Sequence, residues 1–317
     1  MMGDRARMDA YVGALERVVK PGSVVVDVGA GTGIFSLHAC RLGAGRVYAI
    51  DPNPAISLLP ELARRNGFGD RVQVFAKPSG EVELPERADV IVSDLRGSSP
   101  LFAQHLSVLH DARLRFLREG GVMLPAQDTM MMCLISAPEL YDLAVGPLQR
   151  SGFDMQPSID EVVNEVLTDG PYPMPAEQCA SPAVEWSTLV YGAQRDARVS
   201  GDCVLRCDRD ALVHGVALWF RAQIWEELGY ENAPGTTTVY RRCLLPWPTP
   251  LALKRGMNVR VRVDALPTLD DYGFAWSTET ADGTRFKQSN FLGVQAPISG
   301  GPYRSGVSLF TKSSAMP

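Results

Sequence analysis

The sequence predicts two successive folds, an α/β domain with a mostly parallel sheet and then an all-β domain. The first observation is an alternation of strand-like and helix-like segments over residues 4–137, which is typical of βαβ units. The second is a glycine-dense turn at residues 29–33, between an apolar strand and a helix. The third is a change, from residue 184 onward, to short alternating segments broken by Gly, Pro and Asp, which indicates an antiparallel sandwich or barrel.

The elements of the first domain follow one another closely. Residues 4–20 are predicted to form a helix, because Tyr11, Leu15 and Val18 recur at helical spacing and Pro21-Gly22 ends the pattern. The later segments are VVVDVG (24–29, strand), GIFSLHACRLG (33–43, helix), RVYAID (46–51, strand), AISLLPELARRNG (55–67, helix), RVQVFAK (71–77, strand), ADVIVSD (88–94, strand), LFAQHLSVLHDARLRFLREG (101–120, helix) and GVMLP (121–125, strand).

The second domain begins with a change in residue composition. Residues 138–170 are predicted to be helical and acidic, and residues 171–182 are rich in proline. Strand-like segments follow: EWSTLVY (185–191), CVLRC (203–207), HGVALWFRAQIW (214–225), TVYRRCLLPW (238–247), NVRVRVDAL (258–266) and YGFAWSTE (272–279). We therefore expect one domain over residues 1–137 and a second over 138–317, the second including a helical arm at about 138–170.

Composition excludes several classes of protein. An apolar content of 45% and a charged content of 21% describe an ordinary globular chain. A formal net charge of -5 argues against a general nucleic-acid binder. No apolar run approaches the ~20 residues that span a bilayer, and the first residues lack the apolar core of a signal peptide. The six scattered cysteines are expected to be reduced thiols without a metal, and the location is expected to be cytoplasmic.

The glycine turn indicates a nucleotide-bearing ligand. Gly29, Gly31 and Gly33 allow a tight turn and close approach of the ligand to the backbone, and the following helix offers its positive end. Dinucleotide enzymes place pyrophosphate there, whereas an acid at Asp27 would repel it. Asp27 instead suits the ammonium group of a methionine moiety, and Asp51 can accept hydrogen bonds from both ribose hydroxyls. These residues predict a site for S-adenosylmethionine.

A wider resemblance follows from the same residues. DVGAGTGIFSLHACRLGAGRVYAID is similar to the cofactor motif of the protein arginine methyltransferases, and Asp4-x-x-Arg7-x-x-x-Tyr11 resembles the N-terminal helix of that family. The resemblance implies that Arg7 holds the cofactor carboxylate and that Ser79 and Glu81 lie on the adenine side. SGFDMQPSIDEVV (151–163) resembles the dimerisation arm, and HGVALWFRAQIW and PWPTPLALKRG resemble the β-barrel. A homodimer is therefore expected.

The acceptor loop departs from the family pattern. The family grips a guanidinium between two glutamates, because two carboxylates match the fork of guanidinium donors. Asp94 falls on the first glutamate, whereas Ala103, or Gln104 in a shifted register, falls on the second. Thr238-Val239-Tyr240 stands in place of the family's threonine-histidine-tryptophan loop. Asp94 is therefore the expected acid of the acceptor pocket, and ordinary protein-arginine methylation is questioned.

Arg96 and His105 are two further candidates near this loop. Arg96 either receives a carboxylate or phosphate of the substrate or forms an internal ion pair with Asp94 or a helix-end contact. His105 is either a general base for a hydroxyl or ammonium substrate or a structural histidine.

Three hypotheses about function remain open. The first is an S-adenosylmethionine-dependent methyltransferase, with S-adenosylhomocysteine as product, acting on nitrogen or oxygen of a small metabolite, amino acid derivative or peptide. The second is a protein arginine methyltransferase that uses Asp94 with an acid from elsewhere, such as Asp128. The third is an inactive scaffold that binds the cofactor. Its support is the missing glutamate and histidine, whereas the intact cofactor motif opposes it.

Overall fold

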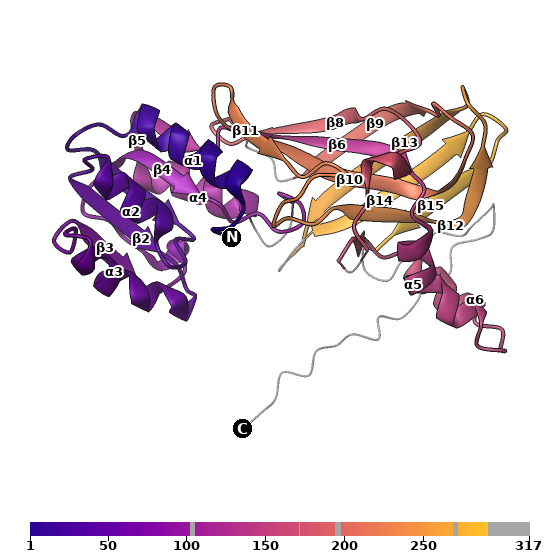
Figure 1. Ribbon diagram of the computed structural model, residues 1–317, viewed down its shortest axis with the longest axis horizontal. Coiled ribbons are helices and arrows are strands. Elements are labelled where there is room, and N and C mark those ends of the chain that lie inside the picture. Colours follow the sequence, from indigo (N-terminus) through magenta and orange to yellow (C-terminus); the bar gives the residue numbers. More distant parts are fainter. Residues whose placement is uncertain (102–104, 171, 194–197, 269–271, 291–317) are drawn as a thin grey trace.

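The computed structural model describes residues 1–101, 105–170, 172–193, 198–268 and 272–290. Figure 1 shows an α/β body built from the N-terminal part of the chain beside an elongated β body built from the C-terminal part. This confirms the predicted fold class, an α/β domain followed by an antiparallel, barrel-like domain.

The first sheet is parallel, and the direction in which successive strands are added reverses after the third strand. It runs β3-β2-β1-β4-β5, comprising β1 (Val24–Val28), β2 (Arg46–Ile50), β3 (Val72–Phe75), β4 (Ala88–Ser93) and β5 (Leu117–Leu124). The chain runs outward from β1 to β3 and then returns to place β4 on the other side of β1. In open α/β sheets a ligand crevice forms at the carboxyl ends of the strands where the order reverses.

Helices cover both faces of this sheet, as the alternation of side chains along its strands requires. The helices are α1 (Arg5–Val18), α2 (Ile34–Arg41), α3 (Leu59–Arg65) and α4 (His105–Phe116), with short 3₁₀ turns η1 (Pro54–Leu58) and η2 (Ser79–Glu81). Val25 belongs to the same buried cluster as Phe35 of α2, whereas Val26 clusters with Phe116 of α4. Helix α4 is shorter than the predicted 101–120, because the chain enters β5 at Leu117.

The second body consists of two antiparallel sheets. One has β7 (Leu167–Thr168), β12 (Cys243–Leu253), β10 (Ala211–Trp225), β6 (Gln127–Ile135) and β8 (Val184–Val190), with β11 (Leu228–Glu231) paired to β10. The other has β15 (Arg285–Ser289), β14 (Tyr272–Thr280), β13 (Asn258–Pro267) and β9 (Val199–Arg206). The expected division at residue 137 needs a correction: β6 pairs with β10 and β8, so residues 127–135 belong to the second body.

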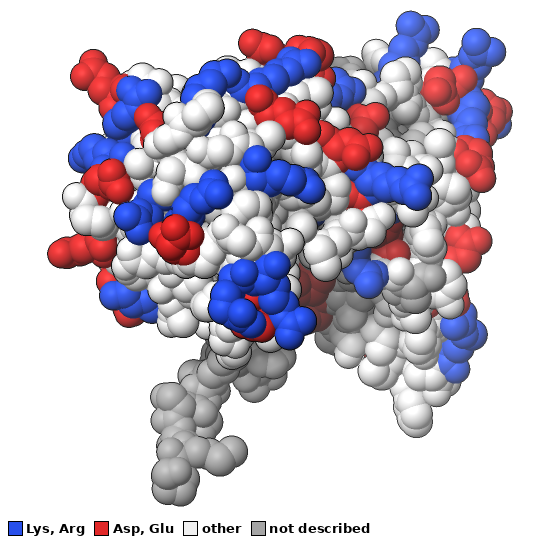
Figure 2. Space-filling view, turned by 60° about the vertical axis from the view of Figure 1, so that its left-hand side comes forward, with Lys and Arg blue, Asp and Glu red and all other residues white. Residues whose placement is uncertain are grey.

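Helices α5 (Pro138–Gln149) and α6 (Gln156–Val162) form an arm that projects from the β body at the lower right of Figure 1. Among the described residues no helix combines the length and apolar character needed to cross a bilayer. Figure 2 shows acidic and basic side chains interleaved over the visible face, without a broad area of one sign.

Candidate active site

The glycine turn lies at the carboxyl end of β1 and leads into α2. Gly29 and Gly33 have φ angles of +77° and +84°, which L side chains rarely adopt. The Gly29 amide donates to the carbonyl of Ile50 at 2.8 Å, so the turn is tied to the neighbouring strand. A Cβ on Gly33 would lie 2.3 Å from a methyl carbon of Leu59, so the close approach of α3 also requires glycine.

Asp51 follows β2 and completes the rim of the turn. One carboxylate oxygen accepts the backbone N–H of Gly31 at 2.7 Å, and the other accepts that of Asn53 at 2.7 Å. The carboxylate is half-buried, and each oxygen retains further lone pairs for a ligand. The structure therefore brings the predicted Gly31 and Asp51 into direct contact.

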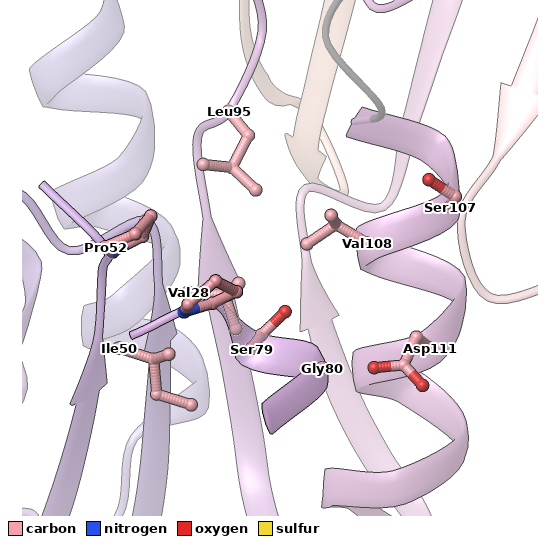
Figure 3. Close-up of a pocket in the computed structure, with 11 residues that line it drawn as sticks. Val28, Ile50, Pro52, Ser79, Gly80, Leu95, Ser107, Val108 and Asp111 are labelled. Atoms are coloured by element: carbon pink, nitrogen blue, oxygen red, sulfur yellow. The ribbon is translucent and has the colours of Figure 1, made fainter. Parts of the chain in front are cut away.

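A cavity of about 470 Å³ opens between these strand ends and α4. Figure 3 shows side chains from β1, β2, η2, α4 and the loop after β4 converging on it. Its lining is mainly apolar with a few polar groups, comprising Val28, Gly29, Ile50, Pro52, Pro78, Ser79, Gly80, Leu95, Ser107, Val108 and Asp111. Apolar walls with a few placed polar groups are typical of a nucleoside site.

The two residues expected on the adenine side, Ser79 and Glu81, differ in their exposure to solvent. Ser79 is buried and lines the cavity, whereas Glu81 is exposed and is not among the lining residues. Sequence analysis did not identify Asp111 and Arg115, which fix this wall. Arg115 pairs with Asp111 at 2.7 Å and donates to the carbonyls of Ser79 and Val82 at 2.6 and 2.7 Å. An Asp and an Arg four positions apart in a helical pattern was the available signal for the pair.

Asp27 is not among the residues that line this cavity, and one of its oxygens is bonded within the fold. The residue is only 1% exposed, and one carboxylate oxygen accepts both the backbone N–H and the hydroxyl of Ser36, at 3.0 and 2.7 Å. The first turn of α2 has unpaired N–H groups, and Asp27 satisfies one of them. Burial raises the pKa of Asp27 to about 6, although the bonds from Ser36 oppose the change.

The raised pKa of Asp27 predicts that the stability difference between the wild type and an Asp27→Asn variant depends on pH. A carboxyl whose folded pKa lies above its unfolded value binds its proton more tightly when folded, so its contribution to stability falls as pH rises. We expect the unfolding free energy of the wild type, measured relative to Asp27→Asn, to fall by about 2 kcal/mol between pH 4.5 and 7.5. Urea denaturation at both pH values checks this, and a difference that is constant or rises with pH would contradict it.

Asp94 lies directly after β4, and the structure places Arg7 beside it. The Arg7 Nε atom donates to one carboxylate oxygen of Asp94. The other oxygen accepts from Arg96 Nη1 at 3.0 Å and from the Tyr240 hydroxyl at 2.5 Å. Burial, followed by the charge of Asp94, raises the pKa of Tyr240, so this hydroxyl keeps its proton. The loop that lacks the expected histidine therefore contributes a phenol to the site.

The same loop is tied to the helix that carries Arg7. The backbone N–H of Val239 donates to Asp4 at 3.0 Å, and the other oxygen of Asp4 accepts the backbone N–H of Arg7 at 3.1 Å. Asp4 therefore joins the start of α1 to the β body. Ala103 and Gln104, the positions expected at the second glutamate, lie outside the described residues.

Arg96 forms an internal ion pair, one of the roles expected for it. Its guanidinium donates to both oxygens of Asp128, at 2.6 and 2.8 Å, and the two side chains are 0% exposed. Further bonds reach the hydroxyls of Tyr11 at 2.7 Å and Tyr230 at 3.4 Å. The guanidinium carbon also lies 5.5 Å from the centre of the Phe220 ring. The expected contact with Asp94 is present, but Asp128 is the main partner.

His105 has the environment of a structural histidine, one of the two roles expected for it. It is fully buried, and its Nε2 lies 2.9 Å from the hydroxyl of Tyr191. Since that hydroxyl donates to Asp128 at 2.5 Å, its oxygen accepts from His105 and assigns the proton to Nε2. Burial and the charge of Arg96 hold the pKa of His105 well below its usual value. A fully buried imidazole with a lowered pKa is a weak general base, because its protonated form is disfavoured.

Among the described residues no group of three His, Cys, Asp or Glu side chains is arranged to hold a metal ion.

The reversed parallel sheet, the glycine turn and the acid after β2 together define the class I methyltransferase fold.

Comparisons with known proteins identify methyltransferases that resemble this chain. A family model described as ribosomal protein L11 methyltransferase (PrmA) matches residues 9–125. A probable protein arginine N-methyltransferase 6 of Arabidopsis thaliana is 31% identical over 236 residues, which cover 69% of this chain and 52% of the relative. An arginine N(omega)-methyltransferase of Streptomyces achromogenes subsp. streptozoticus is 28% identical over 281 residues, covering 83% and 74%. The chain is thus similar to class I methyltransferases of the arginine methyltransferase type.

Solved structures agree on the fold. A Trypanosoma brucei PRMT1 enzyme–prozyme heterotetramer with AdoHcy has a TM-score of 0.84 at 22% identity, covering 91% of this chain and 95% of that chain. Arabidopsis thaliana protein arginine methyltransferase 10 has a TM-score of 0.75 at 19% identity, with the same coverages. The chain spans only 52%, 61% and 59% of the length of three plant arginine methyltransferases that it matches.

Proposed function

We propose that the protein transfers a methyl group from S-adenosylmethionine to a guanidino nitrogen of arginine in a peptide or protein. The observation that carries the proposal is a buried carboxylate, Asp94, at the switch point of a methyltransferase fold, beside the arginine expected to hold the cofactor. The names of the relatives support an arginine acceptor, since the Arabidopsis thaliana relative is named for protein arginine and the Streptomyces relative for arginine.

The residues present fit the cofactor. Asp51 offers carboxylate lone pairs to the ribose, the cavity beside Ser79 and Val108 offers apolar walls to the adenine, and Arg7 offers donors to the carboxylate. When bound, the cofactor supplies an electrophilic methyl group. The chain's own residues bind and orient it, and the burial of Asp94 keeps water from the acceptor side.

Asp51→Ala should test the cofactor assignment. The variant loses a carboxylate that both binds ribose and holds the Gly31 and Asn53 amides in place. We expect the dissociation constant for S-adenosylhomocysteine to rise by roughly 30- to 100-fold, about 2–2.7 kcal/mol, since bonds to a charged group contribute about 1.5–3 kcal/mol each. Isothermal titration measures this, with the exposed Asp210→Asn as control. Unchanged affinity in Asp51→Ala would contradict the assignment.

Asp94 supplies the negative charge that recognises the acceptor. A carboxylate forms short, charge-assisted bonds to a guanidinium, and its attraction keeps the cation next to the methyl donor. The acceptor nitrogen must lie about 3–3.5 Å from the methyl carbon, in line with the bond that breaks.

The deciding experiment is a transfer assay with tritiated S-adenosylmethionine. An arginine peptide, the same peptide with lysine in place of arginine, free arginine and a set of small amines and hydroxylated acids serve as acceptors. Label in the arginine peptide alone, recovered as methylarginine after hydrolysis, is the expected result. Label in free arginine or in a small acid and none in the peptide would contradict the proposal.

One observation favours a second candidate, a chain that binds the cofactor but transfers no methyl group. Both acids near the acceptor position are already neutralised, Asp94 by Arg7 and Asp128 by Arg96. The Trypanosoma brucei structure contains a prozyme beside an enzyme. Tight binding of S-adenosylhomocysteine with no label in any acceptor would select this candidate.

We also infer a homodimer in which the α5–α6 arm contacts a second copy. Phe153, between the two helices, is 79% exposed, and Leu143 on α5 is also exposed. Large apolar side chains on a projecting element are typical of a protein interface. Light scattering of the purified chain measures the mass directly, and a monomer at micromolar concentration would remove this inference.

A further inference from the structure

Asp94 is enclosed by three donors in the arrangement described. Its side chain is 3% exposed, one oxygen is bonded to Arg7, and the other is bonded to Arg96 and Tyr240. The oxygen bonded to Arg7 keeps a lone pair, but an incoming guanidinium would meet the like charge of Arg7 in a buried site, so an acceptor cation pairs with Asp94 when one of the donors leaves.

Two of the three donors are held firmly. Arg96 is fixed by its two bonds to Asp128 and lies over the rings of Phe220 and Tyr230. The Tyr240 ring is buried and packs against the same two rings, with centroids 5.4 and 6.0 Å away. Neither side chain can withdraw without opening this aromatic cluster.

Arg7 is held more loosely. Besides the bond to Asp94, the side chain makes two long hydrogen bonds, 3.4 Å from Nη1 to the carbonyl of Met1 and 3.4 Å to the sulfur of Met8, and it lies 5.7 Å from the ring centre of Tyr11. No partner of its Nη2 is recorded among the described residues. The guanidinium carbon lies 5.2 Å from the ring centre of Phe35, in the first turn of α2 directly after Gly33. Arg7 therefore borders the glycine turn while it neutralises Asp94.

We propose that Arg7 is an exchangeable partner that couples the two ligands: it covers Asp94 until a bound cofactor's carboxylate takes it over. This inference rests on the proposed function. Arg7 and Arg96 balance the charges of Asp94 and Asp128 in the ligand-free chain. Once the cofactor carboxylate pairs with Arg7, the remaining Asp94, Asp128 and Arg96 carry one net negative charge, which matches one guanidinium. Cofactor binding thus precedes and strengthens acceptor binding.

The test measures binding, without catalysis. An arginine peptide is titrated into the protein alone, with saturating S-adenosylhomocysteine, and with saturating 5′-methylthioadenosine, which keeps the nucleoside and thioether but has no carboxylate. We expect S-adenosylhomocysteine to strengthen peptide binding by about tenfold or more, within the usual range of coupling between sites, and methylthioadenosine to leave it unchanged. By linkage, the peptide must strengthen S-adenosylhomocysteine binding by the same factor.

The outcomes separate this inference from the proposed function. Equal peptide affinity in all three states would overturn the exchange while leaving the arginine acceptor intact. An equal gain from methylthioadenosine would also overturn it, because no carboxylate is involved. Absence of peptide binding in every state would overturn the arginine acceptor and the exchange with it.

Variants of two arginines on α1 provide a matched comparison. Arg7→Gln should bind S-adenosylhomocysteine more weakly, and its peptide affinity should be equal with and without that ligand. Arg17→Gln lies on the same helix and loses only exposed pairs with Glu226 and Glu227, so it should retain the full coupling. Full coupling in a folded Arg7→Gln variant would overturn the proposal.

Discussion

Asp128→Ala is expected to lower the free energy of unfolding by about 3–5 kcal/mol. The substitution leaves the Arg96 guanidinium buried with its bidentate partner removed, and an uncompensated buried charge is strongly destabilising. It also removes the acceptor of the Tyr191 hydroxyl, which in turn organises His105. The loss is therefore larger than that of an ordinary surface pair, which contributes about 0–1 kcal/mol.

Urea denaturation of the wild type and four variants measures this effect. The single variants Arg96→Met and Asp128→Ala should both be strongly destabilised, whereas the double variant should recover much of the loss, because replacing a buried pair by apolar groups is often nearly neutral. Asp202→Ala, which removes an exposed partner of Arg260, is the control and should cost no more than about 1 kcal/mol. A loss below 1 kcal/mol in Asp128→Ala would show that the pair is not a buried charge network.

Asp94→Asn is expected to reduce kcat/KM for an arginine peptide by about 10³-fold, or about 4 kcal/mol. Asparagine keeps the shape of the side chain but removes the charge that attracts the guanidinium. In the ligand-free variant, Arg7, Arg96 and Asp128 together carry a net charge of +1, because two guanidinium groups then face only one carboxylate. Both the binding of a cation and its orientation toward the methyl donor should suffer.

Steady-state kinetics with the tritiated donor check this, with Asp210→Asn as a control far from the site. The affinity of Asp94→Asn for S-adenosylhomocysteine should be equal to or higher than that of the wild type, because Asp94 no longer competes for Arg7. A variant that keeps activity within threefold would exclude Asp94 from the acceptor site. Loss of S-adenosylhomocysteine binding would instead assign it a structural role.

The parts of the molecule that the sequence predicted are those that short-range patterns determine. The alternation of strands and helices, the glycine turn and the acid after β2 all depend on residues close together in the chain. Asp27 shows the limit of such patterns, because an acid before a glycine turn suits either a cationic ligand or the unpaired N–H groups of the next helix. In the structure the hydroxyl and amide of Ser36, nine residues later, bond to one of its oxygens.

The acceptor side could not be predicted in the same way, because its contacts join distant segments. The partner of Arg96 is 32 residues away on a strand of the other sheet, and the partner of His105 is 86 residues away. An apolar run such as that of β6 also does not show which sheet it joins, so the expected boundary after residue 137 lies beyond the whole of this strand, which pairs with the second body. Long-range pairing of this kind leaves no local signal.

The position of α1 has a consequence for how the two bodies depend on each other. This helix is held within the α/β body, where the Tyr11 hydroxyl donates to the carbonyl of Ser93 at 2.8 Å. It is also bonded to residues more than 200 positions later, namely Glu226 and Glu227, which bond to Arg17, and Val239, which bonds to Asp4. A substitution in the β body that breaks these bonds therefore also loosens the helix that carries Arg7.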